Sequence, residues 1–113
     1  IIGPNTRGKR RIINSKLEIQ NFKFKIMAKI ERFEDLKVWQ ASRLLAIEVF
    51  ELFNNEKFAK DYSLKDQMNR SSGSIMDNIA EGFERGGKKE FIQFLYIAKG
   101  SAGELRSQIY RAK

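Results

Sequence analysis

Apolar residues at helical spacing, running through most of the chain after about residue 35, are the feature that most constrains the fold. Between residues 63 and 86 they recur every three or four positions, with one serine in the series: Leu64, Met68, Ser72, Ile75, Ile79 and Phe83. Residues at this spacing share one face of an α-helix. The segment is therefore predicted to be an amphipathic helix that buries this stripe against neighbouring helices.

The same spacing predicts two further long helices, one over about residues 36–54 and one from about Lys88 to the end of the chain. Asn54 and Asn55 are expected to end the first helix, and a loop is expected through Tyr62. Ser63 is the predicted N-cap of the middle helix, because its hydroxyl can accept an unpaired backbone N–H group. Glycines 82, 86 and 87 are expected to end that helix in left-handed conformations.

Two of these helices carry apolar residues on a second face. In the first helix these residues are Leu44, Ile47 and Phe50, and in the last helix Tyr96, Gly103 and Tyr110 recur every seven positions. One neighbour cannot cover an apolar surface of this width, so the pattern predicts self-association. The small residues of the segment 100–103 are expected to let a neighbouring backbone approach closely.

Composition narrows the possible functions. The chain has no Cys and no His, which rules out disulfides, thiolate or imidazole nucleophiles, and zinc sites built from these ligands. These absences leave a carboxylate-only Mg²⁺ site, with Glu81 and Glu104 as ligands, as the alternative of an enzyme. The prediction is that the chain has no catalytic residue, no metal and no cofactor. No apolar run reaches the ~18 residues that span a bilayer, and no signal peptide is recognisable, so a cytoplasmic protein without a membrane partner is expected.

The net charge of +8 comes almost entirely from the first thirty residues, which hold eight Lys or Arg against one acid. We therefore divide the chain into a basic N-terminal extension, residues 1–30, and a bundle domain, residues 31–113. Basic and aromatic residues interleave in the extension, as in binders of single-stranded nucleic acid. Nucleic-acid binding is the alternative here. The prediction is that the extension is disordered or is a translated upstream stretch outside the native protein, since Met27 stands just before the organised region.

Uncharged and charged polar residues form a line beside the apolar stripe on each of the last two helices. The middle helix has Gln67, Arg70, Ser74, Asn78, Glu81 and Arg85, and the last helix has Glu90, Gln93, Ser101, Glu104, Gln108 and Arg111. From these lines we predict a structural polar network that fixes the register of the two helices. Its members would be Arg70, Asn78, Glu81, Ser101, Glu104 and Gln108, with Asn78 and Glu81 partly buried and paired to the last helix.

Two clusters of positive charge are candidate nucleic-acid contacts. One is Lys9, Arg10 and Arg11 in the extension, and the other is Arg85, Lys88 and Lys89 around the turn between the last two helices. Backbone amides and cations at such a turn can receive a phosphate. A solvated turn is the competing interpretation, and Trp39 is expected in the core rather than as a base-stacking platform.

Three motifs in order carry a family resemblance: Phe33-x-Asp35-Leu36-x-Val38-Trp39, the segment 78–82, and Phe94-Leu95-x-x-Ala98-x-Gly100-Ser101-x-x-Glu104-Leu105. Together they resemble the small four-helix-bundle proteins encoded by intervening sequences within bacterial large-subunit (23S) ribosomal RNA genes. That family is similar in turn to the accessory protein of diversity-generating retroelements, a basic homopentamer that engages a reverse transcriptase and its RNA. The resemblance implies a bundle that self-associates, and suggests nucleic acid.

These observations predict an all-α, antiparallel helical bundle of the four-helix type, with three long helices present and the fourth truncated, because the last helix reaches Lys113 without a cap. The predicted function is a non-enzymatic interaction or scaffold module that works as a homo-oligomer, a pentamer by resemblance, without a small-molecule substrate. The alternative is an RNA-binding accessory factor that uses the extension and the Arg85, Lys88 and Lys89 cluster.

Overall fold

The computed structural model describes residues 15, 16, 18, 19 and 29–112, and every regular element among them is a helix. Residues 1–31 and 32–113 are separate compact units. In the first unit, the four described residues between 15 and 19 are helical, as is Lys29. The second unit contains three long helices, which confirms the all-α class.

The second unit begins with a single 3-10 turn, η1 (Phe33–Asp35), that leads into the helix α2 (Lys37–Leu52). The Phe33 and Trp39 rings meet edge to face, with their centroids 5.1 Å apart. An Arg32 guanidinium nitrogen donates to a Glu34 carboxylate oxygen at 2.7 Å, which lowers the pKa of this solvent-accessible carboxyl. These local contacts give α2 a fixed start although Leu36, its N-cap residue, provides no side-chain cap.

The connection between α2 and the next long helix holds one helical turn, α3 (Glu56–Ala59), where the sequence predicted only a loop. The Asn55 side chain accepts a hydrogen bond from the Lys57 backbone N–H at 3.1 Å and so caps this turn. The helix α4 (Tyr62–Glu84) then begins two residues earlier than expected. Its N-cap is Asp61, whose Oδ1 accepts from the Leu64 backbone N–H at 3.1 Å, and Ser63 lies inside the helix.

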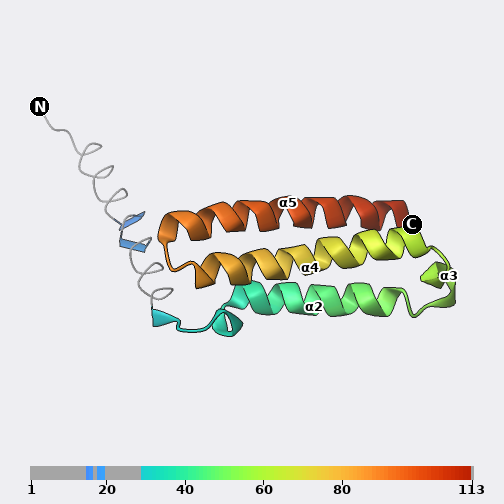
Figure 1. Ribbon diagram of the computed structural model, residues 1–113, viewed down its shortest axis with the longest axis horizontal. Helices are drawn as coiled ribbons and strands as arrows, with labels where there is room; N and C mark the ends of the chain where they lie inside the picture. The colour runs from blue at the N-terminus through green and yellow to red at the C-terminus, as the bar shows by residue number, and fades with distance from the viewer. Residues whose placement is uncertain (1–14, 17, 20–28, 113) are drawn as a thin grey trace, which may run out of the picture. The chain divides into compact units, whose positions relative to one another are not determined.

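Helix α4 lies between α2 and α5 (Lys88–Ala112) and packs on both (Figure 1). The predicted stripe of α4 is confirmed as its inward face, with Leu64, Met68, Ser72, Ile75 and Ile79 all buried. Across the bundle, Met68, Ile79 and Leu105 are the largest side chains that are fully buried. The core is therefore centred on α4.

The turn between α4 and α5 depends on two glycines with different roles. Gly86 has a φ of +79°, the left-handed conformation expected there. Gly82 does not end α4, as had been predicted, but lies buried inside the helix. A Cβ at this position would lie only 2.5 Å from the Phe94 Cβ. Close contact between α4 and α5 thus requires Gly82.

The close approach of a neighbouring backbone that was expected at Gly100 and Gly103 does not occur within the single chain. A Cβ on Gly100 or Gly103 would meet nothing within 4 Å. Both residues lie on the exposed side of α5. Their small size therefore relieves no contact inside this unit.

Replacing Gly82 with alanine is expected to destabilise the protein, although alanine favours helix more than glycine does. The new methyl group would force Phe94 and α5 away from α4, at a cost of about 1–3 kcal/mol in the free energy of unfolding. Gly100→Ala is the matched control, since the methyl group enters open space and should add about 0.5–1 kcal/mol. Urea unfolding followed by circular dichroism measures both, and equal effects would contradict the close contact.

Candidate functional site

A chain of hydrogen bonds links α4 to α5 at the middle of their interface. The Ser74 and Ser101 hydroxyl groups share a hydrogen bond of 2.8 Å across the two helices. The Asn78 side-chain amide donates to the Ser74 Oγ at 3.0 Å and to the Ser74 backbone oxygen at 2.7 Å. Asn78 is half-buried, and its hydrogen bonds link it to α5 through Ser74. Ser74 belongs to the predicted polar line of the middle helix but was not one of the six predicted network residues.

Two of the six predicted network residues pair on their own helix instead. Glu81 accepts from Arg85 at 3.0 Å, and Arg70 lies 3.1 Å from Asp66; all four side chains are more than half exposed. The expectation that Glu81 would be partly buried and bound to α5 was wrong. A partner one helical turn away was closer than any partner across the interface.

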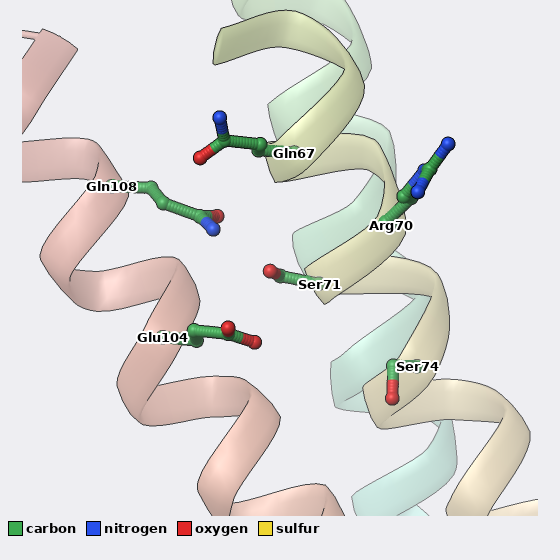
Figure 2. Close-up of a pocket in the computed structure, with 6 residues that line it drawn as sticks. All are labelled: Gln67, Arg70, Ser71, Ser74, Glu104 and Gln108. Carbon is green, nitrogen blue, oxygen red and sulfur yellow. The ribbon is translucent and has the colours of Figure 1, made fainter. Parts of the chain in front are cut away.

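The remaining two, Glu104 and Gln108, line a groove between α4 and α5 of about 400 Å³. Figure 2 shows the side chains of Gln67 and Ser71 pointing from α4 toward Gln108 and Glu104 on α5, while Arg70 points away. Gln108 is buried, and its Oε1 has no hydrogen-bond partner among the described residues. Ser71 was not among the predicted polar residues, and no sequence signal distinguished it.

The basic residues around the α4–α5 turn are largely engaged with other side chains. Arg85 pairs with Glu81, and its guanidinium carbon also lies 5.4 Å from the centroid of the Phe94 ring. Lys88 starts α5 and makes an interaction of its own, while Lys89 is exposed. The cluster Lys9, Arg10 and Arg11 lies outside the described residues.

Exposed apolar side chains follow one face of α2 and one face of α5. On α2, Leu44 is 61% exposed and Phe50 is 59% exposed, with Ile47 between them. On α5, Tyr96 is 68% exposed, and Ile92 and Tyr110 are exposed as well. These are the second apolar faces that the sequence indicated. The sequence analysis missed Ile92, although its position four residues before Tyr96 places it on the same face of the helix.

No group of three carboxylates, the metal-ligating side chains this chain offers, gathers among the described residues. None of the described helices combines the length and the apolar character that crossing a bilayer requires. A second hollow, beside α3, is lined by Glu56, Lys57, Ala59 and Lys60.

The hydrogen bond between Ser74 and Ser101 should contribute measurably to stability. We expect Ser74→Ala and Ser101→Ala to be coupled in a double-mutant cycle by about 0.5–1.5 kcal/mol, the usual net contribution of one hydrogen bond. Ser107→Ala, at an exposed position of α5, should change stability by less than about 0.5 kcal/mol. Thermal or urea unfolding gives all the values, and a coupling of zero would show that the two hydroxyls act independently.

The sequence was compared with protein families, with curated proteins and with solved structures. No curated protein and no solved structure gave a match. The family model described as "23S rRNA-intervening sequence protein" matches residues 34–113, well over half of the chain. The family resemblance seen in the three sequence motifs is thereby confirmed, and the match runs from within η1 to the end of α5. This chain belongs to the 23S rRNA-intervening sequence protein family.

Proposed function

We propose that this protein is a non-enzymatic interaction module that works by self-association through the apolar faces of α2 and α5. The observation that carries the proposal is the exposure of Leu44, Ile47 and Phe50 on one helix, together with Ile92, Tyr96 and Tyr110 on another. Monomeric proteins rarely expose apolar residues in continuous patches of this kind. Burial of such side chains stabilises an interface by about 25 cal/mol per Å² of apolar surface.

The face of α5 has a further property that suits a helix of a second copy. Gly103 lies midway between Tyr96 and Tyr110 at a spacing of seven residues, and open space surrounds it. A helix that crosses there can approach the α5 backbone closely, with an aromatic ring on either side. The cost that an exposed helical glycine imposes on the single chain would then be offset in the assembly.

The resemblance to retroelement accessory proteins suggests five copies in a cytoplasmic, bacterial assembly. The family description names a 23S rRNA intervening sequence, not a reaction. A scaffold that presents repeated surfaces to a partner is consistent with this description. The number of copies is the part of the proposal that rests on resemblance alone.

Light scattering after size exclusion tests the self-association. The protein should give a mass several times the 13.2 kDa of one chain. Leu44→Lys combined with Tyr96→Lys should lower the mass toward one chain, because a buried lysine would be unpaired. Asn69→Lys is the control, since it adds positive charge to an exposed position on α4 and should leave the mass unchanged.

Circular dichroism on the same samples shows whether the variants keep their helices. A parent protein that is a folded single chain at micromolar concentration would refute the proposal. So would a double variant that keeps the parent mass.

RNA binding is the second candidate function, and the exposed Lys89 beside Lys88 at the start of α5 favours it. Lysines there can pair with phosphates near the positive end of the helix dipole. The family's link to 23S rRNA genes supports the same idea.

Two full-length variants compare the possible contact regions: Lys88→Ala with Lys89→Ala, and Lys9, Arg10 and Arg11 all changed to Ala. RNA affinity should fall as salt rises, and removing contacts should make this dependence less steep, by about 0.7–0.9 in the log–log slope per lost phosphate contact. The variant with the larger loss identifies the contact region. Absence of binding by the parent protein at low salt would exclude the function.

A further inference from the structure

Hydrogen bonds link α4 to α5 on either side of the groove that lies between the two helices. At one end, an Arg111 guanidinium nitrogen donates to the Gln67 Oε1 at 2.9 Å, and toward the other end Ser74 and Ser101 share their hydrogen bond. Between these two links lies the space of about 400 Å³ seen in Figure 2. No hydrogen bond among the described residues joins α4 to α5 inside it.

The buried Gln108 side chain contributes a polar group to the lining of this space. The residue is only 7% exposed, and its Oε1 is buried without a partner. A buried acceptor without a donor costs free energy, and native proteins satisfy nearly all such groups. Figure 2 shows the Gln108 amide directed across the groove toward α4.

The charges around the groove are the Glu104 carboxylate and, at one end, the Arg111 guanidinium that donates to Gln67. The Glu104 carboxylate points into the groove and has no ion-pair partner in the described part of the chain. Arg70, the one basic residue among those lining it, is paired with Asp66 and points away. The buried Ser71 hydroxyl faces the same space and adds a further acceptor.

We propose that this groove binds an alkylammonium group, with N–H donors directed to Gln108, Glu104 and Ser71. A primary ammonium carries three N–H donors and no acceptor, which matches an amide oxygen, a carboxylate and a hydroxyl. Hydrogen bonds from a cation to a carboxylate are stronger than neutral ones. Two sources have this chemistry: a free polyamine, and the lysine side chain of a second copy of the chain. Only the second source rests on the proposed self-association.

Calorimetric titration of the full chain with putrescine and with n-butylammonium tests the proposal, and succinate at equal ionic strength is the anionic control. Both amines should bind and succinate should not. Glu104→Gln should weaken amine binding by about tenfold or more, because a charged hydrogen-bond partner is lost. Glu84→Gln, at an exposed position of α4, is the control and should bind as the parent does.

Gln108→Met separates binding from folding. It removes the buried acceptor and keeps the side-chain length, so the melting temperature should stay equal or rise while amine binding weakens. If neither amine binds, or if binding survives both Glu104→Gln and Gln108→Met, the groove holds only water and the proposal is wrong.

Titration with Nα-acetyl-lysine methylamide distinguishes the two sources. Binding as tight as that of putrescine assigns the site to a lysine side chain. Binding several-fold weaker than that of putrescine assigns it to a free polyamine.

Discussion

The packing of α4 on both of its neighbours is the constraint on which the rest of the bundle depends. Met68 and Ile79 are fully buried in α4, while α2 and α5 each pack on it (Figure 1). A helix of this kind must be apolar over a wide arc, and the buried residues of α4 form such an arc. The outer helices need only one buried stripe each, which leaves their second faces available for other contacts.

The α4–α5 interface combines a close apolar contact near the turn with polar contacts further along. Gly82 and Phe94 make the close contact, and Ser74 and Ser101 fix the register without a bulky side chain. Because hydrogen bonds are directional, this small polar link selects one alignment of two helices whose apolar stripes alone would tolerate sliding. In the groove next to the Ser74–Ser101 link, the register of the helices is fixed, but the buried Gln108 Oε1 has no hydrogen-bond partner among the described residues.

Periodicity in the sequence was sufficient to predict the three long helices, the buried stripe of α4 and the second faces of α2 and α5. Periodicity was a less reliable guide where two residues of the chain could fill the same structural role. Asp61 and Ser63 are both good N-cap residues, and the helix used the earlier one. The glycine that permits close packing depends on what lies across the interface, so Gly82 could not be distinguished from Gly100. The partner of Glu81 was mispredicted for the same reason: side-chain pairing is decided by three-dimensional distance.

The positions of the aromatic side chains give the protein two separate optical signals. Its single tryptophan, Trp39, packs against Phe33 beside the start of α2, and all three tyrosines are exposed in the single chain. Tryptophan emission therefore reports whether the bundle is folded. Tyrosine absorbance is sensitive to burial of Tyr96 and Tyr110, so it reports whether the α5 face is covered. Folding and assembly can thus be followed in one cuvette without an added label.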